Sequence, residues 1–326
     1  MIWRLNVVFL AALPLFADDL LRVDVFGLFK PSVAIVEAAG VIVDGREISL
    51  EGQGPAHLHA VSGRIRITVG GESLWADAVE TRPAAGFDLS IPSKIRRRFP
   101  GHLTATAKED RLQLIVGMSR AEAVAATVAA EAPATWPEQA LLAQAVVSRS
   151  YLSAERRRHL GYDFCDTTHC QFLTEATANS QRAAQQTRGE ALTHRGRIIE
   201  ALFTRDCGGR TLSSQGAGFS GDGYSFSAVD CPADDGVRWT RALSAGPPPR
   251  SEAARLQFVR ANGWGALPSN SYRIRQTAQG PVADGRGEGH SVGFCQRGAA
   301  TLARQGLAFR DILARYFPNT VVDRVF

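Results

Sequence analysis

The spacing of apolar residues changes character near Ser119, and this change limits most strongly what the chain can fold into. From Leu20 to about Val116, apolar residues alternate with polar ones in short runs such as RIRITV and RLQLIV, which is typical of half-buried strands. After Ser119 the chain becomes rich in alanine with helical spacing. We therefore predict an α+β protein, with a β-rich N-terminal domain over residues 18–116 and a mixed α/β domain over residues 117–326.

Two capping-box patterns predict where the first helices of the second domain begin. In each pattern a Ser or Thr precedes a Glu by three residues, so the helices should begin after Ser119 and Thr135. Pro133 disfavours helical backbone at the residue before it, so the first helix should end at about Glu131. Farther along we expect a hairpin with its turn at Arg195–Gly196, an insertion over residues 244–269 that contains GPPPR, and closing helices between about Cys295 and Tyr316.

Residues 1–17 have the composition of a signal peptide. The basic Arg4 precedes an apolar stretch of about twelve residues that ends near Ala17, shorter than the roughly 20 residues of a membrane-spanning helix. We expect cleavage to release a periplasmic or extracellular, cell-wall-associated protein that is not integral to a membrane; the alternative is an uncleaved anchor. The net charge of +5 comes without interleaved basic and aromatic residues of a binding module, so we expect no nucleic-acid partner.

Three ordered segments of the second domain resemble one family. They are EAPATWPEQALLAQAVVSRSY, YDFCDTTHCQ and GRGEGHSVGFCQRGA, which begin at Glu131, Tyr162 and Gly285, and IIEALFTRDCGGRT from Ile198 is a weaker fourth match. Together they resemble the stage II sporulation protein D family, which includes the amidase-enhancer proteins. The resemblance covers the chain from about Ser119 to its end and says nothing about the β-rich N-terminal domain.

The resemblance implies that the mixed α/β domain is a catalytic domain with an active-site groove. It implies a lytic transglycosylase, which breaks the bond between N-acetylmuramic acid (MurNAc) and N-acetylglucosamine (GlcNAc) in peptidoglycan glycan strands. The muramic acid's own 6-hydroxyl attacks and leaves a 1,6-anhydro-MurNAc end. The family's catalytic glutamate corresponds to Glu131, which would act as general acid and base. Ala132 follows it here, where the family usually has Met.

The residues around Glu131 are consistent with this chemistry on physical grounds. Ordinary glycosidases need two carboxylates, about 5 Å or about 6.5–9.5 Å apart, whereas an internal hydroxyl lets one carboxyl group serve. A lone acid must be protonated near neutral pH. The expected helix C-terminus favours the neutral acid at Glu131, and Pro133 and Trp136 would shield it from water. From the residues alone, the alternative is an exposed glutamate at a helix end.

The resemblance also implies substrate contacts by four residues, which are Arg149, Tyr151, His290 and Gln296. Arg149 and Tyr151 fit equally well as a helix-surface arginine and a core tyrosine. Two positions depart from the family pattern. Ser291 stands where the family has Gly, and Asp206 stands where it tends to have a small hydroxyl residue.

A cluster of Cys and His predicts a metal site. His159, Cys165, His169 and Cys170 lie within twelve residues, and two thiolates with two imidazoles are typical ligands of closed, tetrahedral structural zinc. The resemblance supports zinc here, since some family members bind it at this place. The alternatives are a Cys165–Cys170 disulfide or unpaired thiols. A closed shell leaves no position for water, which argues against a zinc peptidase, and we expect no organic cofactor.

Two questions stay open in the sequence. Cys207 and Cys231 either form a disulfide, which would contribute roughly 2–4 kcal/mol, or leave Cys207 as a small buried residue beside a glycine turn. The function also has an alternative, a non-catalytic glycan-binding protein that activates a cell-wall amidase. The expected partners are therefore peptidoglycan strands and, in the second case, that amidase.

Overall fold

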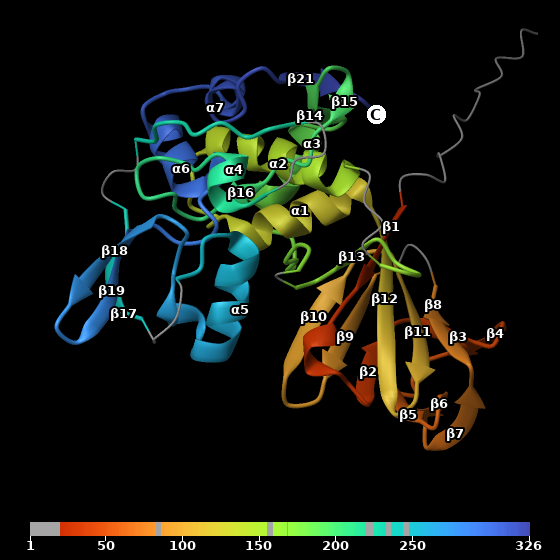
Figure 1. Ribbon diagram of the computed structural model, residues 1–326. Coiled ribbons are helices and arrows are strands. Elements are labelled where there is room, and N and C mark those ends of the chain that lie inside the picture. Colours follow the sequence, from red (N-terminus) through yellow and green to blue (C-terminus); the bar gives the residue numbers. More distant parts are fainter. Residues whose placement is uncertain are drawn as a thin grey trace, which may run out of the picture.

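The computed structural model describes residues 20–82, 86–154, 159–167, 169–219, 224–232, 236–243 and 248–326. The expected signal peptide, residues 1–17, lies outside these ranges, as do residues 244–247 of the expected insertion. The fold is α+β, as predicted, and its N-terminal part is rich in strands. Figure 1 shows the N-terminal strands gathered in one body and most of the helices in a second body beside it.

The N-terminal strands form two sheets that pack face to face. In spatial order the first sheet contains β13 (Phe164–Cys165), β1 (Leu20–Asp24), β12 (Arg111–Ser119), β11 (His102–Lys108), β8 (Ala78–Thr81), β3 (Gly40–Val43) and β4 (Arg46–Ser49). The second contains β10 (Ile95–Phe99), β9 (Phe87–Ile91), β2 (Val33–Glu37), β5 (Ala56–Val61), β6 (Arg64–Val69) and β7 (Glu72–Ala76). Neighbouring strands are antiparallel, except for β1 and β13, which are parallel.

Strands β6 and β12 confirm the alternation predicted for them. Ile65 and Ile67 are buried on one side of β6, and Leu112 and Leu114 are buried on one side of β12. Successive side chains of a strand point to opposite faces, so one face of each strand enters the core between the sheets. Each such side chain contributes roughly 1.5–3 kcal/mol when it is fully buried.

Helix α1 (Arg120–Glu131) begins and ends where the sequence predicts. The side chain of Ser119 accepts a hydrogen bond from the backbone N–H of Glu122, and the Glu122 carboxylate accepts one from the backbone N–H of Ser119. The helix then ends at Glu131, because Ala132 before Pro133 has extended backbone.

Helix α2 (Glu138–Ser153) corrects the second capping prediction. Its N-cap is Pro137, not Thr135, and no side chain forms a cap. Pro137 has φ −56° and ψ 141°, so the helix starts only after the proline, and Thr135 lies too far upstream to cap it.

Helix α2 is the centre of the second body. It is buried from Ala140 to Leu152 because α1, α3 (Ala178–Gln186), α6 (Gln296–Arg304) and α7 (Phe309–Tyr316) pack around it. Among the described residues, no helix combines the length and the apolar character needed to cross a bilayer.

The remaining elements complete the second body. Small sheets are formed by β15 (Arg197–Ile198), β14 (Glu190–His194) and β21 (Val321–Arg324), and by β16 (Phe203–Thr204) with β20 (Phe294–Cys295). The hairpin turn between β14 and β15 falls at Arg195–Gly196, as predicted, with positive φ at both residues. The short helix α4 (Ser214–Ala217) also belongs to this body, whereas η2 (Gly27–Phe29) lies between β1 and β2 in the N-terminal part and η3 (Trp264–Ala266) lies between residues 262 and 267.

Most of the expected insertion belongs to a small unit with its own core. Helix α5 (Glu252–Asn262) accompanies a sheet of β17 (Arg238–Ala242), β19 (Gly280–Arg286) and β18 (Tyr272–Thr277), at the left of Figure 1. The buried residues of this core are Trp239, Val259, Leu267 and Ala283.

The two bodies are joined beside the predicted metal ligands. Strand β13 lies in the second half of the chain, yet it extends the first N-terminal sheet through β1. Arg97 of β10 also forms an ion pair with Asp166, with Nη1 2.6 Å from Oδ2 and side chains only 14% and 9% exposed. The N-terminal domain therefore supports the loop that carries the Cys and His cluster.

Candidate active site

Glu131 is the last residue of α1, and its side chain is half-buried. Burial raises its pKa, in the direction predicted. Hydrogen bonds from Gln296 and Gln171 and the charge of Arg205 act in the opposite direction but do not overcome burial. The neutral acid is therefore favoured over a wider pH range than for a glutamate in water.

Three buried glutamines link Glu131 to its surroundings. Gln171 donates its side-chain amide to Glu131 Oε1 at 3.4 Å. Gln296 donates to the Glu131 backbone carbonyl at 3.3 Å and to Gln144 Oε1 at 3.2 Å. Gln144 in turn donates to Ser148 Oγ at 3.1 Å. The end of α1 is thus held by α2, by the start of α6 and by the segment after Cys170.

Arg205 brings a positive charge toward Glu131. Its charge lowers the pKa of the acid. The Arg205 side chain is 76% exposed, so solvent screens this interaction, and its Nη1 lies 3.4 Å from Glu288 Oε1. Among the described residues, the groups that shift the pKa of Glu131 are two amides and this guanidinium, with no second carboxylate. The site therefore has the electrostatics of a single buried acid.

The structure brings Gln296, but not His290, into contact with Glu131 among the described residues. His290 Nδ1 accepts the N–H of Val292 at 3.1 Å, and its ring lies edge-on to Phe219 with centroids 5.6 Å apart. Burial lowers the pKa of His290, so the imidazole is neutral near neutral pH. A substrate contact by His290 stays a prediction.

Arg149 and Tyr151 face the interior of the second body. Arg149 is 3% exposed and donates to Thr187 Oγ1 at 3.1 Å and to the carbonyls of Ala184 and Glu190 at 2.8 and 3.0 Å. Tyr151 is 6% exposed, and its hydroxyl donates to the Cys170 carbonyl at 3.0 Å. Tyr151 is thus a core tyrosine, whereas Arg149 is buried and is not the helix-surface arginine of the alternative. A role of either residue in substrate binding stays a prediction.

The four predicted metal ligands lie together. One ligand atom from each of His159, Cys165, His169 and Cys170 is within 4.8 Å of every other. His159 Nε2 lies 3.1 Å from Cys170 Sγ, and His169 Nδ1 lies 3.5 Å from the same sulfur. Two sulfurs and two ring nitrogens at these separations fit around one tetrahedral zinc ion. All five cysteines are in the described part of the chain, and none forms a disulfide there.

The Cys and His cluster adjoins the acid through one residue. Gln171 follows Cys170 directly, and its amide is the group that reaches the Glu131 carboxyl. The Tyr151 hydroxyl fixes the Cys170 carbonyl from the other side. A metal ion held by Cys170 would therefore also fix the donor beside Glu131.

Three residues around Glu131 were missed by the sequence analysis. Gln171 ends the second matched segment, but nothing in the spacing indicated that its amide would reach Glu131. Gln144 is a polar residue on the buried side of a predicted helix, which could have marked it. Arg205 carries no local signal, because it approaches Glu131 only through the tertiary fold.

The two departures from the family pattern have structural explanations. Asp206 is 2% exposed, and its carboxylate accepts the backbone N–H groups of Gly208 at 2.8 Å and Val237 at 3.0 Å, which ties two loops together. Ser291 has φ 62°, a left-handed conformation that suits glycine. Its backbone N–H donates to Thr204 Oγ1 at 3.1 Å.

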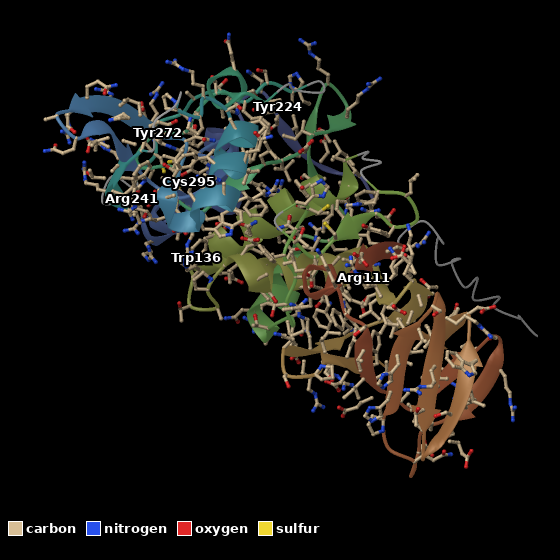
Figure 2. The ribbon with its side chains drawn as sticks, turned by 60° about the horizontal axis from the view of Figure 1, so that its bottom comes forward. Arg111, Trp136, Tyr224, Arg241, Tyr272 and Cys295 are labelled. Atoms are coloured by element: carbon tan, nitrogen blue, oxygen red, sulfur yellow. The ribbon has the colours of Figure 1, made fainter. Side chains whose placement is uncertain are left out.

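A groove of about 950 Å³ lies on the small sheet of β17, β18 and β19. Five arginines line it, together with Trp239, Tyr272 and Asn270; they are Arg210, Arg238, Arg273, Arg275 and Arg286. Figure 2 shows Tyr272 and Arg241 on this part of the molecule, away from Arg111 in the N-terminal strands. The groove offers cationic and aromatic groups to a ligand.

Comparison with known proteins agrees with the motifs. The family described as Stage II sporulation protein matches residues 108–194, which include Glu131 and the Cys and His cluster but end before Gln296. The amidase enhancer of Bacillus subtilis (strain 168) is 32% identical over 148 residues, 44% of this chain and 20% of that protein. An uncharacterised protein of Brachyspira hyodysenteriae is 23% identical over 304 residues, 81% of each chain.

These matches concern one part of the chain. The segment from the end of β11 to the end of β14 matches the stage II sporulation protein family, and the amidase enhancer is a partial relative. The match spans only about a fifth of the amidase enhancer's length.

Proposed function

We propose that the protein acts on the bacterial cell wall as a peptidoglycan lytic transglycosylase, with Glu131 as general acid and base. The observation that carries this proposal is the half-buried Glu131, whose pKa burial raises and whose described electrostatic neighbours are amides and one guanidinium. A glycosidase of the ordinary type would use a second carboxylate in a defined position. A lone acid fits a reaction in which the substrate supplies its own nucleophile.

In the proposed reaction, Glu131 donates one proton, accepts another and returns to its starting protonation state. The neutral carboxyl group donates its proton to the glycosidic oxygen, and the bond from that oxygen to C1 of MurNAc breaks. The carboxylate then takes the proton of the MurNAc 6-hydroxyl as O6 bonds to C1. The products are a GlcNAc hydroxyl end and 1,6-anhydro-MurNAc, and Glu131 is protonated again. General acid–base catalysis of this kind contributes about 10²- to 10⁴-fold.

The surrounding residues take supporting roles in this proposal. Gln171 and Gln296 hold the acid at the end of α1 and stabilise its carboxylate after proton donation. Neutral His290 is available to hydrogen-bond a sugar hydroxyl or N-acetyl group. Arg149 and Tyr151, which are buried, act as positioning residues for α3 and for the Cys170 backbone.

We propose a structural zinc ion for the Cys and His cluster. His159, Cys165, His169 and Cys170 would hold it, and the bound ion would crosslink the loop without a free coordination position. Its effect on catalysis would pass through Gln171, the next residue in the chain.

The expected location and substrate are consistent with each other. An exported protein in the periplasm or at the cell wall meets peptidoglycan strands, whose stem peptides and lactyl groups carry carboxylates. The arginine-lined groove supports binding of such an anionic strand.

Product analysis tests the proposal. The full chain is incubated with purified glycan strands, with and without stem peptides, and the products are weighed by mass spectrometry. We expect 1,6-anhydro-MurNAc ends, and loss of turnover in Glu131→Gln but not in Glu138→Gln, an exposed glutamate at the start of α2. Reducing MurNAc ends without anhydro sugar, or full activity of Glu131→Gln, would overturn it.

The relative named amidase enhancer supports a second candidate function, a non-catalytic glycan-binding activator of a cell-wall amidase. In this function the protein would still bind glycan strands, but Glu131 would not act as an acid or base. Glycan binding without turnover, combined with faster cleavage by an added cell-wall amidase that persists in Glu131→Gln, would establish it in place of the first.

A further inference from the structure

Three cysteines from separate segments meet in the interior of the second body. Their Sγ atoms all lie within 4.8 Å of one another, although they belong to three distant parts of the chain; they are Cys207, Cys231 and Cys295. They are 0%, 6% and 0% exposed. Figure 2 shows Cys295 in the part of the molecule that lies away from Arg111 and the N-terminal strands. We name this group the three-cysteine cluster. It shares no residue with the Cys and His cluster.

The three-cysteine cluster is surrounded by hydrogen-bond donors. Cys295 Sγ accepts the backbone N–H groups of Cys207 at 3.3 Å and Gly298 at 3.4 Å. The Tyr316 hydroxyl lies 3.1 Å from Cys231 Sγ. A neutral thiol is only a weak acceptor, whereas a metal-bound thiolate gains from such donors. The arrangement therefore suits sulfurs that carry negative charge.

Gly298 shows that the space around the sulfurs is tightly defined. A Cβ atom at this position would collide with both Cys231 Sγ and the Tyr316 hydroxyl. Residue 298 therefore has to be glycine for α6 to approach the cluster so closely. Only a small occupant, such as a single ion, is compatible with this packing.

The three thiols need a cation if they are to ionise. Three thiolates this close together in the interior would repel one another without a counter-charge. A bound metal ion supplies the missing positive charge and deprotonates its thiols outright. A disulfide would join only two of the three and leave one buried thiol.

We propose that Cys207, Cys231 and Cys295 form a closed site for one soft, thiophilic metal ion, Cu⁺ or Zn²⁺. Thiolate ligands select these ions. Each thiol that binds releases its proton to solvent and the ion keeps its oxidation state, so no oxidant or reductant is needed. Three sulfurs suit three-coordinate Cu⁺, whereas Zn²⁺ usually takes four ligands and would recruit an oxygen such as that of Tyr316.

The proposed ion would fasten three segments near the active site. Cys295 caps α6 and directly precedes Gln296, which contacts Gln144 and the Glu131 backbone. Cys207 follows Arg205 by two residues. The inference itself does not depend on the proposed reaction, because metal binding is measured without substrate.

Metal titration of the full chain tests the inference. The variant Cys165→Ser/Cys170→Ser disables the Cys and His cluster, and anaerobic titration with Cu⁺ or Zn²⁺ then reports the three-cysteine cluster alone. We expect one ion per chain, with sulfur-to-metal charge-transfer absorption for Cu⁺. When Cys231→Ser is added to this double variant, the affinity for the metal ion should fall at least tenfold, which is typical when a ligand or its supporting partner is lost.

A second measurement uses the wild-type chain, so it does not depend on whether a variant folds. Bound metal should protect Cys207, Cys231 and Cys295 from alkylation, as mapped by peptide mass spectrometry. A Cys207–Cys231 disulfide in the purified chain, or equal alkylation with and without metal, would overturn the inference. Failure of the chain to bind either Cu⁺ or Zn²⁺ would also overturn the inference.

Discussion

Gln171 donates its side-chain amide to Glu131 Oε1 at 3.4 Å, although the two residues are 40 positions apart in the chain. Because Gln171 follows Cys170, the loop that gathers the Cys and His cluster also places this donor. Glu131 and the Cys and His cluster thus belong to one arrangement, and the ion pair of Arg97 with Asp166 anchors that loop to the N-terminal domain.

Replacing Glu131 by Gln should make the protein more stable near neutral pH. Burial raises the pKa of Glu131 in the folded state, so wild-type stability declines as pH rises through that pKa, while Gln does not titrate. The Tm difference between the variant and wild type should be small below the usual pKa of glutamate and should grow toward neutral pH. Thermal melts across this range check it, and a difference independent of pH would contradict it.

Gln171→Ala should move the alkaline limb of the pH–rate profile to higher pH. The amide lowers the pKa of Glu131, so its removal keeps the acid protonated longer. Because the carboxylate also loses its donor, kcat should fall up to about tenfold, the equivalent of roughly 1.5 kcal/mol. The control is Gln185→Ala on the exposed face of α3. An unmoved alkaline limb would show that the amide does not act on Glu131.

Removing the metal ion from the Cys and His cluster should lower both stability and kcat. We expect one zinc ion per chain at this cluster, and Tm lower by about 5 °C or more in Cys170→Ser. The loss of activity should appear in kcat more than in KM, because the ion would act by fixing the position of Gln171. Elemental analysis with melting curves and kinetics checks it. A wild-type chain that holds no metal in this cluster would disprove the assignment.

Arg97→Met should destabilise the protein by about 3–5 kcal/mol. It leaves the buried Asp166 carboxylate without its guanidinium partner, at a place where both side chains are at most 14% exposed. Arg64→Met removes a comparable pair with Asp77 whose side chains are 50% and 79% exposed, and should cost about 0–1 kcal/mol. Denaturant unfolding of both variants measures the contrast, and equal costs would refute it.

Ser291→Gly should stabilise the protein by about 1 kcal/mol. The left-handed backbone at φ 62° strains a residue with a Cβ atom, and the buried Oγ of Ser291 has no hydrogen-bond partner among the described residues. Ser291→Ala removes the hydroxyl but keeps the strain, so it should gain less than the glycine variant. Unfolding free energies of the pair separate the two causes, and a less stable glycine variant would contradict the strain.

Local patterns in the sequence predicted much of the secondary structure correctly. The alternation in β6 and β12, the capping box at Ser119 and the stop before Pro133 depend on neighbouring residues, and the structure confirms all three. Pro137 was the exception. Its fixed φ and missing N–H delay the start of α2, which a capping pattern at Thr135 does not reveal.

Long-range contacts could not be predicted in the same way. Cys207, Cys231 and Cys295 gave no sign of a common cluster, because the sequence suggested at most a pair between the first two. Gln171 and Arg205 likewise lie near Glu131 only in the tertiary structure, in which β13 pairs with β1 and α6 packs on α2. Such contacts depend on chain topology, and residue spacing does not encode it.

The sequence by itself determined the α+β class, the family motifs, the position of Glu131 at a helix end and the four residues of the Cys and His cluster. These features depend on periodicity and short-range chemistry, which a linear chain displays directly. Only the tertiary structure decided that Gln171 and Gln296 hold Glu131, that Arg149 and Tyr151 are buried, and that three distant cysteines meet. Packing around α2 produces these contacts, because it brings segments far apart in the chain within hydrogen-bond reach.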